Sequence, residues 1–292
     1  MPELPDIEVY REAIAARVVG HPLVAIALRN PFVLRTAVPP IEEVTGKSVR
    51  ALTRIGKRIV LELDGDYFLV LHLMVAGRLL WLVAGRKPPG RITLALFEFP
   101  AGTLVFTEAG TKRRASLHVV KGHAGLSAFD MGGLDVLRVD RATFSERLRL
   151  ENHTVKRALT DPRLMSGIGN AYSDEILHRA RLSPLALTQK LADDSIGSLF
   201  EATRGVLTEW TQRLRNEAGS DFPKSVTAFR PEMAVHGRFG QPCPECGAKV
   251  QRIVYAENEC NYCARCQTNG VVLADRALSR LLHKSFPRTL DD

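Results

Sequence analysis

MPELPDIEVY, residues 1–10, opens the chain, and the other motifs of the sequence are organised around it. Removal of the initiator methionine would leave Pro2 as a free secondary amine, and an α-amino group titrates near ~7.7–8.0, well below lysine. Such an amine is partly neutral at working pH and can attack an aldehyde-like carbon to give an iminium. Glu3 beside it can act as an acid or base. Taken alone, these residues favour a simpler interpretation, in which Pro2 and Pro5 only stiffen the start of the chain.

The composition is that of a globular protein with a basic excess. A length of 292 residues suggests two domains, and 45% apolar and 25% charged residues are ordinary values. Lys+Arg of 40 against Asp+Glu of 32 gives a net charge of +8, which indicates a polyanionic partner such as nucleic acid. No apolar run reaches the ~18 residues of a membrane span. The start lacks a basic region followed by an apolar core, so we expect no signal peptide.

The first part of the chain combines one helix with many short strands. Apolar residues at Ile7, Tyr10, Ile14 and Val18 predict an amphipathic helix that ends near Gly20. The period then changes over residues 23–120. Strand-like runs, separated by turn signals such as Asp64-Gly65 and Pro100-Ala-Gly102, cover residues 59–63, 68–73, 91–99 and 103–107. Short strands in this arrangement predict an antiparallel sandwich or barrel.

The second part of the chain is helical. A less regular, Gly-containing stretch, Lys121–Arg141, precedes it, and helical periodicity returns from about Thr143. One long apolar stripe begins after Asp193-Asp194-Ser195, which we predict as cap residues. Its members are expected to be core residues without special chemistry: Ile196, Leu199, Thr203, Leu207, Trp210 and Leu214.

A glycine-rich turn lies within the segment Asp161–Leu177. Gly167 and Gly169 bracket the turn, and Asn170 opens a helix whose free backbone N–H groups could hold a phosphate. A Gly-x-Gly pair alone is weak evidence for an anion site. The sequence around it gives the pair its weight.

All five cysteines crowd into residues 243–266. Cys243 with Cys246, and Cys263 with Cys266, form two C-x₂-C pairs separated by residues 247–262, where Val250–Tyr262 would form a hairpin. Four thiolates so paired can surround Zn²⁺ tetrahedrally, and a site closed by four sulfurs is structural. Cys260 falls outside the pattern and is expected to be a spare thiol.

Four motifs in this order resemble the formamidopyrimidine-DNA glycosylase and endonuclease VIII family of base-excision repair enzymes. They are the Pro2-Glu3-Leu4-Pro5 start, Gly56-Lys57, Gly167-Ile-Gly-Asn-Ala-Tyr172 and the cysteine cluster, and the resemblance covers residues 1–267. It implies an α+β fold, with an N-terminal helix and antiparallel β-sandwich, then a helical domain with a helix–two-turns–helix and a β-hairpin zinc finger. The predicted boundaries are 1–130 for the catalytic domain, 131–150 for a linker, 151–235 for the helical domain, 236–270 for the zinc finger and 271–292 for a C-terminal extension.

The resemblance also implies an activity. Enzymes of this family rotate a damaged base out of double-stranded DNA, remove it and cut the strand. Pro2 would attack C1′ of the sugar, Glu3 would help to open the sugar, and Lys57 would contact phosphate and assist catalysis. β-Elimination, commonly followed by δ-elimination, would then break the backbone. We expect one structural zinc ion, duplex DNA with damaged bases or abasic sites as partner, no membrane contact, a monomer, and a cytoplasmic, nucleoid-associated location of the bacterial type.

DNA-binding residues are carried over from the family by position. Asn170, with Gly169 before it, matches the asparagine that grips the phosphate beside the lesion, and Lys156 looks like another backbone-contacting lysine. His72 precedes the position of the family's wedge methionine, which falls at Met74 or Val75. The family also has a loop whose arginine fills the space that the rotated base leaves, and Arg113 or Arg114 would be that arginine. Asp6 stands where the family usually has glutamate.

Several departures concern lesion recognition. The arginine of the family's zinc hairpin is replaced by Asn258, and Arg252 or Arg265 could substitute for it. The void-filling loop, Glu108–Ala115, has no aromatic residue beside its arginines. The segment Arg215–Arg238 is shorter than the lesion-capping loop of the 8-oxoguanine enzymes. Thr268–Asp292 continues past the zinc module, where three leucines suggest a docked helix: Leu278, Leu281 and Leu282.

Two alternatives to a glycosylase that acts on oxidised bases therefore stay open. One is a lyase for abasic sites or unusual lesions with little activity on 8-oxoguanine. The other is a zinc-containing binder of damaged DNA that has lost cleavage, against which the presence of Pro2, Glu3, Lys57 and Asn170 speaks. The sequence decides neither the preferred lesion nor the base required opposite it.

Overall fold

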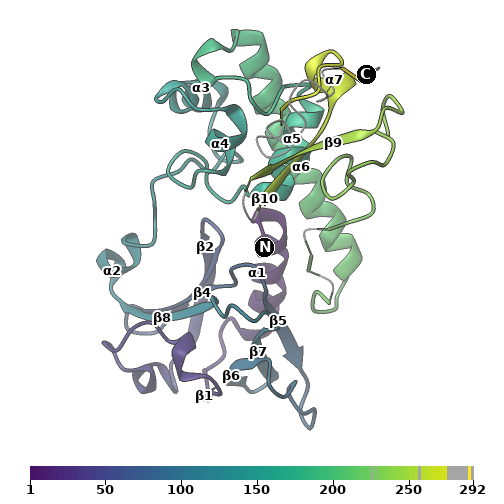
Figure 1. Ribbon diagram of the computed structural model, residues 1–292. Coiled ribbons are helices and arrows are strands. Elements are labelled where there is room, and N and C mark those ends of the chain that lie inside the picture. Colours follow the sequence, from purple (N-terminus) through teal and green to yellow (C-terminus); the bar gives the residue numbers. More distant parts are fainter. Residues whose placement is uncertain (225, 228, 256–257, 275–288, 291–292) are drawn as a thin grey trace. The chain divides into compact units, whose positions relative to one another are not determined.

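The computed structural model describes residues 1–224, 226–227, 229–255, 258–274 and 289–290 (Figure 1). The chain divides into two compact units, and the division falls within the long helix α6 (Asp193–Ala218). The first unit comprises Met1–Met131 and Trp210–Thr227, and the second comprises Gly132–Glu209 and Ala228–Asp292. The α+β class predicted from the sequence is confirmed.

Helix α1 (Leu4–Val18) opens the first unit and is preceded by Glu3 at its N-cap position. Proline at the start of a helix loses no hydrogen bond, since the first N–H groups have no partner within the helix, and Asp6 lies favourably near the positive helix end. The predicted apolar face is buried, with Ile7, Tyr10, Ile14 and Val18 at most 1% exposed. Gly20, with φ of 82°, follows the helix end and permits the left-handed turn there.

The remainder of the first unit is a sandwich of two four-stranded antiparallel sheets (Figure 1). One sheet has the order β2-β3-β4-β8 and the other has the order β1-β6-β7-β5. The strands are β1 (Ala25–Leu28), β2 (Val49–Ile55), β3 (Arg58–Leu63), β4 (Tyr67–His72), β5 (Gly77–Leu82), β6 (Thr93–Phe99), β7 (Gly102–Glu108) and β8 (Ser116–Lys121), with short helices η1 (Pro31–Val33), η2 (Ile41–Val44) and α2 (His123–Ser127). Residues of α1 and of both sheets form one buried core, which also includes Phe222 from the segment after α6.

The second unit begins with helix α3 (Arg141–Arg149), which lies in the segment predicted as a linker. Its N-cap residue, Asp140, accepts a hydrogen bond of 2.8 Å from the Thr143 N–H. The helices α4 (Val155–Thr160), α5 (Asn170–Arg179) and η3 (Thr188–Lys190) follow, then α6. The strands β9 (Val250–Tyr255) and β10 (Asn258–Cys263) form a hairpin that continues into α7 (Ala264–Thr268). The domain boundaries drawn from the sequence stay predictions.

The apolar stripe of α6 is buried along its predicted residues, from Ile196 to Leu214. The helix begins at Asp193, so Asp193 and Asp194 are residues of the first turn and not caps; their carboxylates there favour the positive helix end. None of the described helices combines the length and apolar character needed to cross a bilayer. Of the C-terminal extension, Thr289 pairs with Val271, whereas Leu278, Leu281 and Leu282 lie outside the described residues.

Candidate active site and nucleic-acid interface

The N-terminus of the first unit is a buried, charged site. Glu3 is 2% exposed, and its backbone N–H donates 3.0 Å to Oδ2 of Asp6, which fixes the residue as the helix begins. Pro2 is buried as well. Burial lowers the pKa of the terminal amino group on Met1, as do the charges of Arg78 and Lys57, while the carboxylate of Glu3 acts in the opposite direction. The surroundings of the N-terminus therefore favour the neutral form of a terminal amine, which is the nucleophilic form.

Lys57 lies in the two-residue turn between β2 and β3 and not within a strand. Gly56 before it has φ of 58°, a left-handed conformation that glycine adopts without strain. Burial lowers the pKa of Lys57, and the Glu3 carboxylate acts against that effect. The turn thus brings a lysine to the same electrostatic environment as the terminal amine.

Arg78 also acts on this site, although none of the sequence motifs pointed to it. It lies at the start of β5, and its guanidinium donates 2.7 Å to the Gly77 carbonyl and 3.1 Å to that of Val75. Its charge lowers the pKa of the terminal amine. The guanidinium is positively charged and can only donate hydrogen bonds. It therefore disfavours the protonated form of a nearby amine and favours a nearby anion.

His72 ends β4, opposite Arg58 on one side and Ser116 on the other. Burial and the charges of Arg58 and Lys57 lower the pKa of His72 to about 4. His72 is therefore neutral at physiological pH, and one of its ring nitrogens can donate a hydrogen bond.

The turn from Leu73 to Gly77 carries the predicted wedge. The Gly77 N–H donates 2.8 Å to the Leu73 carbonyl, and a Cβ on Gly77 would lie 2.2 Å from that oxygen, so only glycine fits. Met74 has φ of 52°, and Val75 is 60% exposed at the tip. Of the two candidate positions, Val75 presents the exposed apolar side chain.

The predicted void-filling loop is anchored by a buried carboxylate. Glu108 is 2% exposed and accepts hydrogen bonds from the N–H groups of Arg114 (3.0 Å) and Ala115 (3.2 Å). Arg113 and Arg114 are exposed, and the Arg113 guanidinium donates 3.1 Å to the Arg91 carbonyl. The loop therefore displays cations on a fixed backbone. Their contact with DNA stays a prediction.

In the second unit, Asn170 opens α5 with Gly169 as N-cap. Its side-chain amide donates 2.7 Å to the Glu259 carbonyl on β10, and its own carbonyl accepts 2.8 Å from Nζ of Lys156. The first backbone N–H groups of α5 and the Asn170 side-chain amide therefore lie together at the start of the helix. Such an arrangement of donors can bind an anion.

Lys156 is bound to a buried charge cluster that sequence reasoning missed. Its Nζ donates to Oδ1 of Asp174, a side chain with 0% exposure. Oδ2 of Asp174 also lies 2.7 Å from Nδ1 of His236 and accepts 3.1 Å from the Asn261 N–H. The neighbouring Glu175 accepts from the N–H groups of Ala234, Val235 and His236. These bonds tie α5 to the zinc hairpin.

The four predicted zinc ligands gather at one point. The sulfurs of Cys243, Cys246, Cys263 and Cys266 all lie within 4.8 Å of one another, with Sγ–Sγ distances of 3.4 Å for Cys246–Cys263 and 4.0 Å for Cys243–Cys266. Tetrahedral Zn–S bonds of about 2.3 Å place sulfurs roughly 3.8 Å apart, so the cluster fits zinc. Cys260 lies elsewhere, in an apolar cluster with Ile253, Tyr262 and Leu273, and burial raises its pKa.

Both candidates to replace the hairpin arginine already contact other groups of the protein. The Arg252 guanidinium lies 4.3 Å from the Phe239 ring centroid and 3.6 Å from the Glu259 carboxylate. Arg265 donates 3.3 Å to the Cys246 carbonyl. Asn258 begins β10. A substitute for the arginine is therefore not identified among these residues.

Comparison with known proteins matches three family models along the chain. Residues 1–115 match the formamidopyrimidine-DNA glycosylase N-terminal domain, residues 135–217 match the H2TH domain of the same enzymes, and residues 240–269 match the zinc finger found in FPG and IleRS. The formamidopyrimidine-DNA glycosylase of Pelotomaculum thermopropionicum is 30% identical over 277 residues, which cover 91% of this chain and 99% of that protein.

Solved structures of DNA complexes are similar as well. A complex between a Lactococcus lactis FPG mutant and DNA containing Fapy-dG gives a TM-score of 0.81 at 26% identity, with 91% of this chain and 100% of that chain covered. A complex between the Lactococcus lactis Fpg and DNA with an abasic site gives 0.80 at 25%, with 91% and 99% covered.

The sandwich, the helical segment that matches the H2TH domain and the four-cysteine hairpin together define a DNA repair glycosylase with a zinc finger. The match to the Pelotomaculum thermopropionicum enzyme, which covers 91% of this chain and 99% of that protein, defines the family within this class. The chain belongs to the formamidopyrimidine-DNA glycosylase family. Cys243, Cys246, Cys263 and Cys266 form its one structural zinc site.

Proposed function

We propose that this protein excises oxidised bases from duplex DNA through the amine of Pro2 and then cuts the strand as an abasic-site lyase. The observation that carries the proposal is the buried N-terminus: Pro2 and Glu3 are both buried, and the charges of Glu3, Arg78 and Lys57 act on the terminal amine of Met1, the residue directly before Pro2. Such a cluster would be costly in a protein that did not use it, since buried charges need partners.

The chemistry follows from the groups present. The lone pair of the Pro2 nitrogen attacks C1′, the C1′–base bond breaks, and the base departs with the electron pair and a proton. Opening of the sugar, with Glu3 supplying a proton to the ring oxygen, gives an iminium between Pro2 and C1′. The iminium acidifies the C2′ proton, so its removal expels the 3′ phosphate. A second elimination expels the 5′ phosphate, and water then releases the sugar fragment from Pro2.

Cations and helix ends would hold the DNA backbone. Lys57 supports phosphate binding next to the amine, and Asn170 with the first N–H groups of α5 supports it in the second unit. His72, Arg113, Arg114 and the tip residue Val75 are proposed as further contacts. Lys156 has a supporting role, since its ammonium holds the Asn170 carbonyl. The partner is double-stranded DNA with damaged bases or abasic sites, bound by a monomer.

A second candidate is an abasic-site lyase with little activity on 8-oxoguanine. The observation that favours it is the small exposed side chain at the tip of the wedge turn, where Val75 offers less apolar volume than methionine. An aromatic residue is also missing from Glu108–Ala115. Duplexes with an oxidised purine, an oxidised pyrimidine or an abasic site, nicked in parallel, separate the two candidates: cleavage of the abasic duplex alone supports the second.

The state of the N-terminus tests the proposal itself. Intact mass identifies protein that begins at Pro2 and protein that retains Met1, in which the Pro2 nitrogen is an amide. Only the former should nick an abasic duplex, and both should bind it. Glu3→Gln should slow nicking by roughly 10²–10⁴-fold, whereas the exposed control Glu42→Gln should not. Equal nicking by the two forms would refute attack by Pro2.

A further inference from the structure

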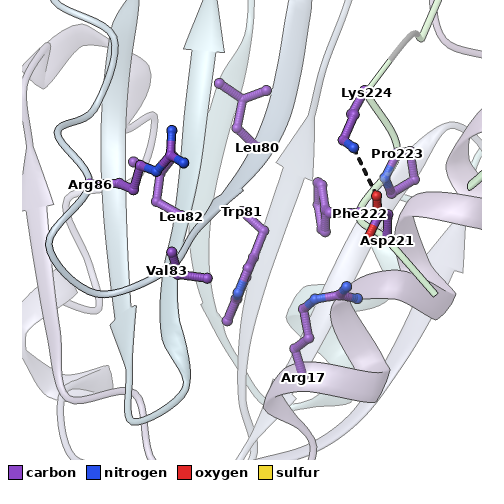
Figure 2. A pocket seen from close by; sticks show the side chains of 10 residues that line it. All are labelled: Arg17, Leu80, Trp81, Leu82, Val83, Arg86, Asp221, Phe222, Pro223 and Lys224. Atoms are coloured by element: carbon purple, nitrogen blue, oxygen red, sulfur yellow. Dashed lines mark hydrogen bonds and ion pairs between the residues drawn. The ribbon is translucent and has the colours of Figure 1, made fainter.

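An apolar pocket with a basic rim lies in the first unit, and neither Pro2, Glu3 nor Lys57 lines it (Figure 2). Its volume is about 540 Å³, within the range of ligand-binding cavities. It lies between the end of strand β5, which contributes Leu80, Trp81 and Leu82, and the segment Asp221–Lys224 that follows α6. Figure 2 shows the Trp81 and Phe222 side chains beside each other in the pocket.

The pocket adjoins an unpaired strand edge. Of the described strands, only β7 pairs with β5, so the second side of β5 has no strand beside it. The Arg78 carbonyl accepts 3.2 Å from Oγ1 of Thr107 on β7, whereas the Leu79 N–H donates 3.3 Å to Oη of Tyr10 on the other side. Backbone groups alternate between the two sides of a strand, so the N–H and C=O of Trp81 face the same side as those of Leu79. The Leu79 N–H already has Tyr10 as its acceptor, so the N–H and C=O of Trp81 are the groups that can pair with an added strand.

The floor of the pocket is aromatic. The rings of Trp81 and Phe222 are stacked with centroids 6.5 Å apart. Phe222 is 9% exposed and belongs to the sandwich core, so this floor is rigid. The Arg17 guanidinium lies 6.0 Å from the Trp81 ring and 5.6 Å from the Phe222 ring. An apolar side chain that enters the pocket would therefore meet a preformed surface.

The rim is positively charged. Arg17, Arg86 and Lys224 line the pocket, and the single lining carboxylate, Asp221, pairs with Lys224 at 2.8 Å. Arg17 donates to the backbone carbonyls of Ala13 and Ser220. These acceptors are uncharged, so they do not neutralise the guanidinium. The pocket thus favours a ligand that is both acidic and apolar.

The pocket is distant from the proposed nucleophile. Pro2 precedes α1, and Arg17 lies in its last turn. A rise of 1.5 Å per residue over the helix separates the two by roughly 22 Å. A ligand in the pocket would leave the amine uncovered.

We propose that this pocket binds an extended acidic segment of a partner protein, which adds a strand to the free edge of β5 and places an apolar side chain against Trp81 and Phe222. Alternate residues of a strand point to opposite sides, so one set would enter the pocket while acidic residues meet Arg86 and Lys224. A single-stranded nucleic acid would also be attracted by the rim, but its backbone has no N–H and C=O pattern to match a strand edge. The peptide is therefore the ligand that uses every feature of the pocket.

The probe is a short fluorescent peptide in which aspartate and leucine alternate around one phenylalanine. We expect saturable binding to the full chain, seen by anisotropy. Arg86→Glu combined with Lys224→Glu should weaken it by roughly tenfold or more, whereas Arg35→Glu, an exposed arginine that does not line the pocket, should not. The double variant should nick an abasic duplex at the normal rate, which separates this proposal from the proposed function.

Fluorine NMR shows where the peptide binds. The chain has two tryptophans, so protein labelled with 5-fluorotryptophan gives two resonances, assigned with Trp210→Phe. The Trp81 resonance should move on titration. Backbone N-methylation of the peptide at alternate residues should abolish binding, since it removes the donors for strand pairing. The proposal is overturned if the peptide does not bind, if the methylated peptide binds equally, if only Trp210 responds, or if a single-stranded oligonucleotide displaces the peptide.

Discussion

Replacing Asp174 with asparagine tests whether the buried charge cluster of the second unit holds in place the end of α5 that we propose binds phosphate. The Asp174 side chain has 0% exposure and the Lys156 side chain 13%, so the substitution leaves a mostly buried ammonium without its carboxylate. Removing one partner of a buried ion pair costs roughly 3–5 kcal/mol of unfolding free energy. Because Lys156 keeps its bond to the Asn170 carbonyl, we expect the lower end, about 3 kcal/mol of unfolding free energy.

A double-mutant cycle with Lys156→Met isolates the pair. Removing both charges should be less destabilising than the sum of the single changes by about 1–2 kcal/mol, because no unpaired charge remains. Hydrogen exchange in peptides from residues 155–177 and 258–263 measures this locally. That readout is needed because a chain of two units need not unfold in one step.

DNA binding gives a second readout for the same variants. If Lys156 acts through Asn170, then Lys156→Met should weaken binding without changing the salt dependence. Loss of a direct phosphate contact would reduce the slope of log K against log salt by ~0.9. Additive stability effects, or a reduced slope, would refute the positioning role.

The other perturbations act on single features of each unit. Burial lowers the pKa of Lys57, so its positive charge is lost at a lower pH than that of an exposed lysine. The rate of nicking of an abasic duplex should fall over that pH range. In a pH–rate profile, Lys57→Arg should move this fall to higher pH. His72 has a pKa of about 4 in the folded protein, against ~6.5 for an unfolded histidine. The folded state therefore binds fewer protons, and the free energy of unfolding should decrease as pH falls from ~6.5 to ~4. In urea titrations, His72→Gln should flatten this decrease. Zinc chelation should lower exchange protection in β9 and β10 while β2, β3 and β4 keep theirs, because the four cysteines that zinc joins flank this hairpin and lie outside the sandwich; uniform loss would contradict a local zinc role.

Features encoded by local pattern could be predicted from the sequence. The spacing of Ile7, Tyr10, Ile14 and Val18 defines the buried face of α1, because helical periodicity is decided within a few turns. Asp64-Gly65 marks the β3–β4 turn, where Gly65 and Asp66 adopt positive φ. The C-x₂-C pairs predicted the cysteine cluster, because ligand spacing reflects the geometry of one ion.

Features that depend on distant segments could not be predicted. Asp174 and His236 are far apart in sequence, and on α5 alone Asp174 looks like an ordinary polar residue of a helix surface. Residues Gly77–Leu82 lack the alternation of a strand, since both faces of β5 are partly covered, and the open edge beside Trp81 appears only when β7 is seen to pair on one side. The electrostatic proximity of Lys57 to the N-terminus likewise depends on a distant segment, because the β2–β3 turn that holds Lys57 is far from Met1 in the sequence.

Borohydride trapping on an abasic duplex tests the central claim most directly, because it captures the iminium between protein and sugar. Protein that begins at Pro2 should give a covalent adduct, and digestion followed by mass spectrometry should place the sugar on the peptide that starts with Pro2. The adduct should be absent from protein that retains Met1. An adduct on Lys57 or another lysine, or none with correctly processed protein, would contradict catalysis by the N-terminal amine.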